Sequence, residues 1–291
     1  MRFLSVRENY VLVELADLEE TLALYGALEE APITGIREII PAARTLLIEF
    51  DPREVSVASL QPTLDSLGSG KRKAPSAVVV EIPVQYDGED LPEVASLLGL
   101  SEDEVVRLHT DSEYTVAFTG FAPGFAYLSG GDPRLAVPRR TSPRTSVPAG
   151  SVGLAGEFSG VYPKSSPGGW QLIGSTSLEM FDINRESAAL LQPGYRVRFK
   201  RAVNSESTNV VSTKVSSSPL REERMRPAGE ASMEVVSCAL PVVFQDLGRA
   251  GQTSQGISRS GAADRASLKA ANRLVGNAAG AAGLEVTLGG L

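Results

Sequence analysis

Short strand-like stretches separated by glycine and proline turns fill the middle of the sequence and constrain its fold most strongly. Between Val78 and Lys200 these stretches are VVVEIPVQY, YTVAFTGF, TSVPAGSVGLAG, GWQLIGST and YRVRFK. Many short strands with closely spaced turn residues favour a closed or nearly closed β-barrel. A helical insertion interrupts them, because Ser101 and Glu104 form a capping box that predicts a helix from Ser101 to about His109. The sequence therefore predicts a β-barrel domain over residues 76–200.

The first 75 residues predict a separate, small α/β domain. A strand over Tyr10 to Ala16 is followed by a helix with Asp17 at its N-cap, and then by the strand-like stretches ITGIREIIP and RTLLIEFD. The next stretch, SVASLQPTLDSLG, is expected to be helical despite Pro62. The order β-α-β-β-α indicates a small sheet covered by two helices, of the ferredoxin-like type.

The C-terminal part predicts a linker and the beginning of a further domain. Residues 201–231 are rich in Ser, Thr, Asn and charge, which is typical of a linker. Residues 232–291 return to a folded pattern of strand, glycine-rich loop and the helix DRASLKAANRLVG. About sixty residues of this kind cannot bury much core alone, so an incomplete domain is expected. The predicted fold class is α+β.

Composition narrows the possible partners of the chain. A net charge of -7 argues against nucleic acid, and the main cationic cluster outside the linkers, Arg134, Arg139, Arg140 and Arg144, suits a small anionic ligand better. A single cysteine, Cys238, excludes an intramolecular disulfide framework. The sequence shows no secretion signal and no apolar run long enough to cross a bilayer, so no membrane partner and a cytoplasmic location are expected.

His109 is the only histidine, so any imidazole chemistry belongs to it. Its place near a helix end before a strand would let it project into a cleft at the barrel end, and its ordinary pKa suits proton transfer. The alternative is a surface or helix-capping histidine. Serine-hydrolase motifs fail at Ser151 and Ser258, where Ala149 and Ser260 replace a required glycine. One histidine and no paired cysteines give no expected metal site.

Three stiff loops are the strongest binding signal from the residues themselves. The loops GFAPGFAYL, PRRTSPRTSVPAGSVG and YPKSSPGGWQLIG place prolines and glycines beside rings or arginines. Such loops lose little entropy on binding, and their amides can hold a carboxylate or carbonyl oxygen. We therefore expect the rings to form a pocket wall; the alternative is that they are core.

The stretch from His109 to Gly174, with GFAPGFAYLSGGDPRLAVPRRTSPRTSVPAGSVG and YPKSSPGGWQLIG, resembles the family called allophanate hydrolase subunit 1. This family includes the B subunits of 5-oxoprolinase and the KipI-like proteins, and the resemblance covers roughly residues 1–200. The tail, FQDLGRAGQTSQGISRSGAADRASLKAANRLVG, resembles the start of the companion subunit 2 family, which holds the C-type and KipA-like proteins. The chain thus resembles a fusion of both subunits that stops early in the second.

The resemblance implies a cyclophilin-like β-barrel and a truncated second cyclophilin-like domain. It implies a subunit of an ATP-dependent 5-oxoprolinase, a hydrolase that opens 5-oxoproline to glutamate together with a C-type (KipA-like) domain and a TIM-barrel-like A-type subunit. Because the chain has neither a P-loop nor a biotin-attachment lysine, we expect ATP to be bound by the complex and no covalent biotin. Two alternatives stay open: a biotin-dependent carboxyltransferase of the urea carboxylase type, and a KipI-like inhibitor of a sensor histidine kinase.

The expected site combines this resemblance with the loops. His109 would relay a proton, while Arg140 and Arg144 would bind a carboxylate or phosphate. The further expected substrate-binding residues are Phe121, Pro123, Gly124, Phe125, Ser151, Tyr162, Gly168, Gly169, Trp170 and Gln171, with Gln245, Asp246, Arg249 and Asp264 from the tail. The sequence departs from the family at Ser175 and Ser177, where Arg and Pro are expected, and at Ala263, where Met is usual.

Overall fold

The computed structural model describes residues 1–67, 76–202, 237 and 240–287. The chain divides into two compact units, Met1–Ala202 with Arg249–Arg259, and Val203–Gly248 with Ser260–Leu291. The predicted linker over 201–231 lies, from residue 203 onward, outside the described residues. No helix in the described part of the chain is both long and apolar enough to span a membrane.

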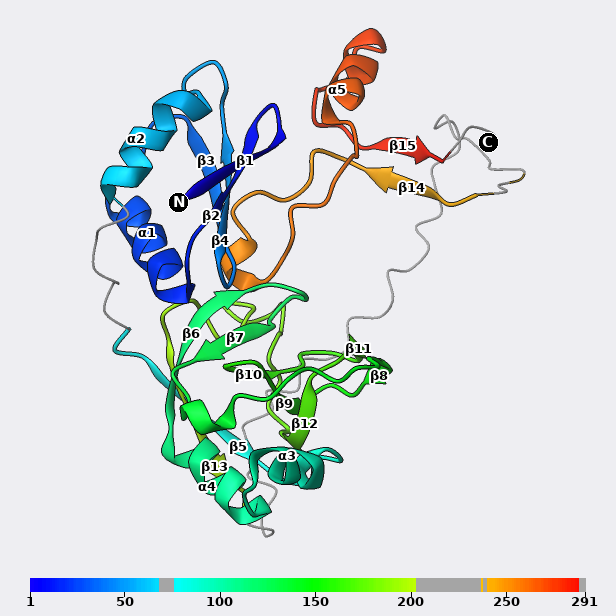
Figure 1. Cartoon of the computed structure of the whole chain (residues 1–291). Coiled ribbons are helices and arrows are strands. Elements are labelled where there is room, and N and C mark those ends of the chain that lie inside the picture. The colour runs from blue at the N-terminus through cyan, green and yellow to red at the C-terminus, as the bar shows by residue number, and fades with distance from the viewer. Residues whose placement is uncertain (68–75, 203–236, 238–239, 288–291) are drawn as a thin grey trace. The chain divides into compact units, whose positions relative to one another are not determined.

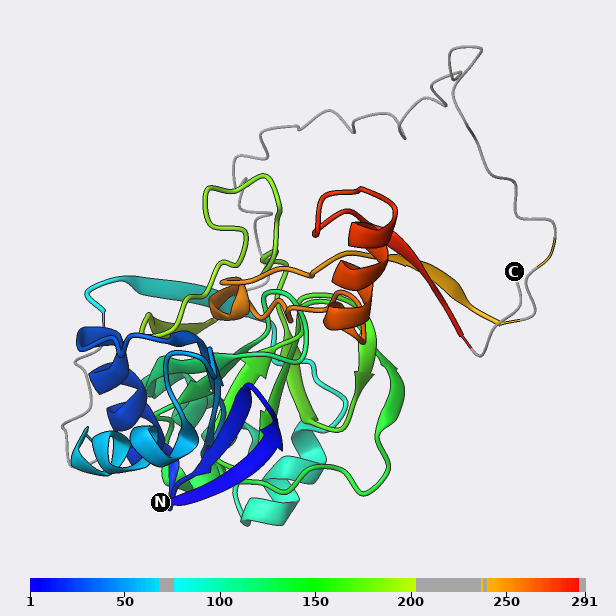
Figure 2. The ribbon, with the colours of Figure 1, turned by 90° about the horizontal axis from the view of Figure 1, so that it is seen from above.

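The N-terminal domain of the first unit is an antiparallel sheet with both of its helices on one face (Figures 1 and 2). Its sheet has the order β1-β2-β4-β3. The elements are β1 (Arg2–Arg7), β2 (Tyr10–Glu14), α1 (Leu18–Glu30), β3 (Ile36–Pro41), β4 (Thr45–Phe50) and α2 (Val57–Leu67). Asp17 caps α1 as predicted, since its Oδ1 accepts the Glu20 N–H at 2.9 Å.

The predicted β-α-β-β-α order is present in this domain as β2-α1-β3-β4-α2. Strand β1 is an addition to the predicted elements, and it pairs with β2 at the edge of the sheet. The fourth strand therefore comes from the N-terminus, whereas a ferredoxin-like chain supplies it after the second helix.

The second domain of the first unit is a nearly closed β-barrel, as predicted. Its sheet has seven strands in the order β12-β9-β10-β7-β6-β13-β5. The open edges meet where Gln85 and Ser175 each donate a backbone N–H to the other's carbonyl at 2.8 Å. The strands are β5 (Val79–Val84), β6 (Glu113–Thr119), β7 (Ala126–Ser129), β9 (Ser151–Ala155), β10 (Phe158–Val161), β12 (Gln171–Ser175) and β13 (Arg196–Arg201). A separate two-stranded ribbon joins β8 (Arg144–Val147) to β11 (Ser166–Gly168).

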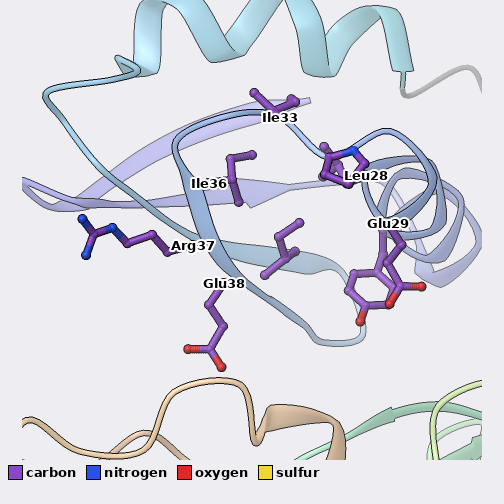
Figure 3. Close-up of a pocket in the computed structure, with 9 residues that line it drawn as sticks. Leu28, Glu29, Ile33, Ile36, Arg37 and Glu38 are labelled. Carbon is purple, nitrogen blue, oxygen red and sulfur yellow. The ribbon is translucent and has the colours of Figure 1, made fainter.

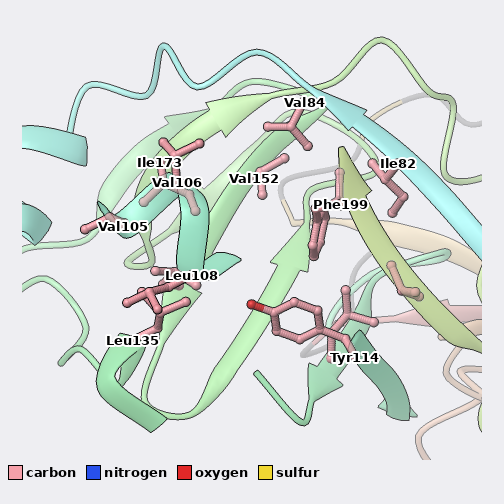
Figure 4. Packing of buried hydrophobic residues seen from close by; sticks show 14 of the residues in the cluster. Ile82, Val84, Val105, Val106, Leu108, Tyr114, Leu135, Val152, Ile173 and Phe199 are labelled. Atoms are coloured by element: carbon pink, nitrogen blue, oxygen red, sulfur yellow. The ribbon is translucent and has the colours of Figure 1, made fainter. Parts of the chain in front are cut away.

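Two helices and a short 3-10 turn complete the barrel domain: α3 (Leu91–Leu98), α4 (Glu102–Asp111) and η1 (Pro133–Leu135). The capping box predicted at Ser101 and Glu104 is present at the start of α4. Helix α4 packs its apolar face into the barrel, where each fully buried aliphatic side chain contributes about 1.5–3 kcal/mol. Figure 4 shows members of this core, including Ile82, Val84, Val105, Val106, Leu108, Val152, Ile173 and Phe199.

The segment Arg249–Arg259, which contains the 3-10 turn η2 (Thr253–Gln255), belongs to the first unit. The Thr119 hydroxyl donates to the Thr253 carbonyl at 2.6 Å, and the Gly124 N–H donates to the Gln255 carbonyl at 2.9 Å. Arg259 forms an ion pair with the buried carboxylate of Glu49 on β4. This segment is thus fixed by both backbone and charge contacts.

The second unit is small and buries little. Strand β14 (Val242–Gln245) pairs with β15 (Gly283–Val286), and α5 (Arg265–Leu274) precedes β15 (Figure 2). Among its described residues only Ala262 and Asn272 are buried, while Phe244 is 78% exposed. The described residues of this unit therefore form little core of their own, and an incomplete domain stays a prediction.

Candidate functional site

Asp90 organises a cluster of two arginines at one end of the barrel. It occupies the N-cap position of α3, but its side chain makes no bond to that helix. Instead, one carboxylate oxygen accepts hydrogen bonds from Arg140 Nη1 and Arg144 Nη2, both at 2.7 Å. The other oxygen accepts the Leu172 N–H at 2.7 Å, and the side chain is only 3% exposed. Asp90 therefore joins α3, the arginine-rich loop and β12.

The sequence alone implied that Arg140 and Arg144 are free to bind an anion, but in the structure both are paired with carboxylates. Arg144 also contacts Glu89 at 2.7 Å, and Arg140 lies 3.8 Å from Glu93. The hydrogen bond from Arg144 to Asp90 raises the pKa of Arg144, so this guanidinium stays charged. Two guanidinium groups thus face three carboxylates, and the cluster cannot attract an anion by excess positive charge. Arg140 Nε and Arg144 Nη1 nevertheless remain buried without a partner among the described residues.

Gln171 adds an unused acceptor from the neighbouring strand. Its Nε2 donates to the Pro138 carbonyl at 3.3 Å, while its buried Oε1 has no partner in the described part of the chain. The Arg140 N–H donates to the Gly169 carbonyl at 2.8 Å, which holds the two loops together. The loops predicted from the sequence thus bring guanidinium donors and an amide acceptor into one region.

The rings expected to form an open pocket wall are packed core instead. Trp170 and Tyr162 each meet the Phe125 ring edge to face, at centroid distances of 5.3 and 5.4 Å. All three rings are at most 5% exposed. Gly168 permits this packing, because a Cβ there would lie 2.3 Å from the Tyr162 hydroxyl oxygen. Burial of large apolar rings decides their position, and the prediction of a wall open to ligand is wrong for these three.

Phe121 is different, because its side chain is 60% exposed. Its φ of 68° lies in the left-handed region, where a bulky residue is a strained outlier. The same loop packs closely against Phe181 at Gly124, where a Cβ would lie 2.7 Å from Phe181 Cβ and where φ is 81°. A rigid loop thus presents one aromatic face outward. Pro123 is half-buried in the same loop.

Ser151 is buried at the start of β9 and is only 6% exposed. Its backbone carbonyl accepts a hydrogen bond from the Tyr162 N–H at 2.9 Å. The predicted role of Ser151 in substrate binding stays a prediction.

His109 lies inside the barrel core, and the predicted position in a cleft is wrong. Its ring is fully buried, with Nδ1 2.7 Å from the Tyr86 hydroxyl and Nε2 2.8 Å from the Ser159 hydroxyl. It stacks on Phe199 at 4.2 Å. Burial lowers the pKa of His109 to about 3, so the ring is neutral near pH 7. The reason is local: His109 lies on the face of α4 that packs against the barrel.

The predicted tail residues have local structural contacts. Asp264 caps α5 by accepting the Ala266 and Ser267 N–H groups at 3.0 Å, and Asp246 accepts the Gly248 N–H at 2.7 Å. Gln245 pairs with Gly283 in the β14–β15 ribbon. Arg249 donates its backbone N–H to the Arg259 carbonyl at 2.7 Å. Their contribution to a shared site stays a prediction.

A pocket of about 250 Å³ between α1 and β3 is a weaker candidate (Figure 3). Its lining mixes apolar side chains, including Ile33 and Ile36, with charged ones. Its charged members already have partners: Arg37 pairs with Asp51, and Glu38 accepts the Gly251 N–H at 3.2 Å.

The first unit is thus an α+β structure with an N-terminal domain and a β-barrel domain. The barrel domain carries the candidate site, which is a cluster of guanidinium and amide groups. Residues 1–191 match the family described as carboxyltransferase domain, subdomain C and D, and residues 255–291 match carboxyltransferase domain, subdomain A and B. The chain belongs to the carboxyltransferase C and D subdomain family.

Individual relatives agree with this assignment. The chain is 44% identical over 189 residues to the B subunit of 5-oxoprolinase from Bacillus subtilis, covering 60% of this chain and 79% of that protein. A further 59 residues, 20% of this chain and 19% of the relative, are 44% identical to the C subunit of 5-oxoprolinase from Escherichia coli. The solved structure of TTHA0988 is 38% identical with a TM-score of 0.68, covering 94% of this chain. The chain spans 55%, about half, of the length of that structure. The resemblance seen in the sequence is confirmed.

Proposed function

We propose that the chain is a subunit of an ATP-dependent 5-oxoprolinase complex, supplying the B-type part and the beginning of the C-type part. The observation that carries this proposal is the 44% identity to a 5-oxoprolinase B subunit over 79% of that protein. The shorter match to a C-type relative supports the fused arrangement. The remaining partner would be the TIM-barrel-like A-type subunit, with ATP bound by the assembled complex. The barrel would be of the cyclophilin-like type.

The arginine cluster fits the chemistry of this substrate. 5-Oxoproline carries a carboxylate, a lactam N–H and a lactam carbonyl. Because the cluster holds one more carboxylate than guanidinium, the unpartnered Arg140 Nε and Arg144 Nη1 would donate to the uncharged lactam carbonyl, and Gln171 Oε1 would accept from the lactam N–H. Hydrolysis adds water to the carbonyl carbon and breaks its bond to nitrogen, which takes up a proton. Fixed donors near the carbonyl stabilise the charge that develops on its oxygen.

In this proposal Asp90 and His109 act without touching substrate. Asp90 fixes both guanidinium groups, while the buried, neutral His109 supports the barrel from within and does not serve as proton relay. The strained, exposed Phe121 would contact substrate or another protein of the complex.

The test is ATP hydrolysis stimulated by 5-oxoproline, measured with the chain reconstituted with its A-type and C-type partners. We expect Arg144→Ala to lower the stimulated rate at least tenfold, since charge-assisted hydrogen bonds contribute about 1.5–3 kcal/mol. The control is Arg107→Ala, whose exposed side chain pairs with Asp111 on the surface of α4 and should leave the rate unchanged. Full activity in folded Arg144→Ala would contradict the site assignment, and no stimulation in the unaltered complex would contradict the function.

A second candidate is a carboxyltransferase of the urea carboxylase type. The specific observation in its favour is that both family matches carry a carboxyltransferase description. Consumption of carboxybiotin in the presence of urea, without any response to 5-oxoproline, would favour this candidate over the first.

A further inference from the structure

The loop Gly120–Phe125 holds Phe121 in a conformation that needs support from its surroundings. The Ala122 N–H donates to the Gly120 carbonyl at 2.8 Å, and Phe121 between them has a φ of 68°. A hydrogen bond across two residues around a positive φ is typical of the rare and strained form of the γ-turn. Such strain persists only where the surrounding structure fixes it. The contacts that this loop makes therefore decide whether Phe121 keeps its exposed position.

The turn Thr253–Gly256 contacts this loop near both of its ends. The Thr119 hydroxyl, directly before the loop, donates to the Thr253 carbonyl at 2.6 Å. Near the other end of the loop, the Gly124 N–H donates to the Gln255 carbonyl at 2.9 Å. Both bonds use backbone carbonyls of the turn, so the backbone conformation of the turn decides whether they can form.

Gly256 packs against the middle of the loop. A Cβ at Gly256 would lie 2.5 Å from the Ala122 carbonyl oxygen, which is closer than real Cβ atoms come. That oxygen is itself held, because it accepts the Phe125 N–H at 2.9 Å. Gly256 also ends the turn with a φ of 73°. Glycine is thus required here both for the positive φ and for the close approach.

The segment that carries this turn is fixed on both sides of it. Before the turn, the Gly251 N–H donates to the Glu38 carboxylate at 3.2 Å. After the turn, Arg259 forms an ion pair with the buried carboxylate of Glu49. Both partners belong to the sheet of the N-terminal domain. These two anchors keep the turn seated against the barrel loop.

The loop and the turn come from the parts of the sequence that match different families. The match to subdomain C and D covers residues 1–191, which include the loop, and the match to subdomain A and B begins at residue 255, within the turn. The segment Arg249–Arg259 belongs to the first unit, although the residues directly before and after it belong to the second. We propose that the turn Thr253–Gly256 is a positioning element, through which the subdomain A and B sequence holds Phe121 in its exposed conformation.

This inference goes beyond the proposed function, because it concerns how one part of the chain controls an aromatic surface on another. While the turn is seated, the Phe121 ring meets Phe125 and Tyr162 edge to face at 5.3 and 6.2 Å. When the turn is displaced, the strained φ relaxes and the Phe121 ring leaves both neighbours. The surroundings of this one ring therefore report whether the turn is seated.

The experiment places 4-fluorophenylalanine at position 121 of the full chain and records its fluorine NMR signal. The rings of Phe125 and Tyr162 displace this signal from its value in the urea-unfolded chain. Thr119→Val removes the hydroxyl at nearly constant shape, and it should raise the population of the released loop about fivefold, the factor that one hydrogen bond contributes. The signal should then move toward the unfolded value. Thr119→Ser keeps the hydroxyl and should restore the signal, while Gly256→Ala should move it further.

Gly251→Ala is the matched control for Gly256→Ala. The two glycines lie in the same segment with φ of 71° and 73°, but a Cβ at Gly251 meets nothing within 4 Å. Gly251→Ala thus imposes the same backbone strain without the clash and should leave the fluorine signal in place. Thr110→Val is the control for Thr119→Val, since the Thr110 hydroxyl donates to carbonyls of its own helix, α4.

The imidazole signals of His109, the only histidine, report on the barrel core and should be the same in all variants. Three results would each overturn the proposal: an unmoved fluorine signal in both Thr119→Val and Gly256→Ala, equal movement in Gly251→Ala and Gly256→Ala, or the same movement in Thr119→Ser as in Thr119→Val. None of these outcomes depends on the response to 5-oxoproline, so this inference and the proposed function fail separately.

Discussion

Replacing Asp90 by alanine should cause the largest loss of stability among single changes in the arginine cluster. The substitution leaves two guanidinium groups without their shared carboxylate and the Leu172 N–H without its acceptor. Removing one partner from a buried ion pair costs about 3–5 kcal/mol. Because Arg140 and Arg144 keep 30% and 17% of their side-chain surface exposed, water replaces part of the loss. We therefore expect a loss of about 3 kcal/mol for Asp90→Ala, at the low end of that range.

Asp90→Asn separates charge from shape, since its carbonyl oxygen can still accept the Leu172 N–H. Asp90→Asn should lower the free energy of unfolding by about 2 kcal/mol, because charge-assisted hydrogen bonds are roughly twice as strong as neutral ones. The assay is urea unfolding at equilibrium, with the free energy extrapolated linearly to water. The control is Asp103→Ala, whose side chain is 84% exposed and pairs with Arg201 on the surface, where a pair contributes about 0–1 kcal/mol. A loss at Asp90→Ala no greater than at Asp103→Ala would refute the reasoning.

Three further predictions concern other parts of the first unit. The pKa of His109 is about 3 in the folded chain and about 6.5 when unfolded, so the unfolded state binds more protons between these values. The unfolding free energy should therefore fall by about 2 kcal/mol from about pH 6.5 to about pH 5, and His109→Gln should abolish that fall. Arg259→Ala should cost about 2–3 kcal/mol in urea unfolding, because it leaves the carboxylate of Glu49, 4% exposed, without its cation. Adding Glu49→Gln should recover part of this loss. Gly124→Ala should lower the free energy of unfolding, measured by thermal unfolding, by about 2 kcal/mol or more. The reasons are the positive φ at this position and the clash of the new Cβ with Phe181.

Each of these predictions has a result that contradicts it. A pH dependence that His109→Gln leaves intact would show that another group titrates in that window. An Arg259→Ala chain as stable as the unaltered one would mean that Glu49 is not held by this pair. Gly120 offers the control for Gly124, since a Cβ at Gly120 meets nothing within 4 Å. Equal effects of alanine at both glycines would contradict the argument from close packing.

Local features of the fold were predictable because their causes are local. The cap at Asp17 and the capping box at Ser101 lie where the sequence places them, because a side chain three residues from its partner needs no tertiary information. The barrel strands followed from turn residues and apolar runs. Strand β1 was missed, because its pattern RFLSVR gains its meaning only by pairing with β2.

The site was predictable only in part. Arg140 and Arg144 were found from the sequence, but their main partner, Asp90, is 50 and 54 residues away. Asp90 stands before a Leu-Pro helix start, so its local signal is that of an ordinary N-cap. The rings Phe125 and Trp170 carry the same glycine-rich context whether they line a pocket or fill a core. Only the tertiary packing decides between these alternatives.

The most direct test of the central claim is ATP hydrolysis by the chain reconstituted with A-type and C-type 5-oxoprolinase partners, with and without 5-oxoproline. We predict that 5-oxoproline stimulates hydrolysis, that glutamate accumulates, and that both responses are lost without this chain. Hydrolysis that is unchanged by 5-oxoproline, with no glutamate formed by a fully assembled complex, would contradict the claim.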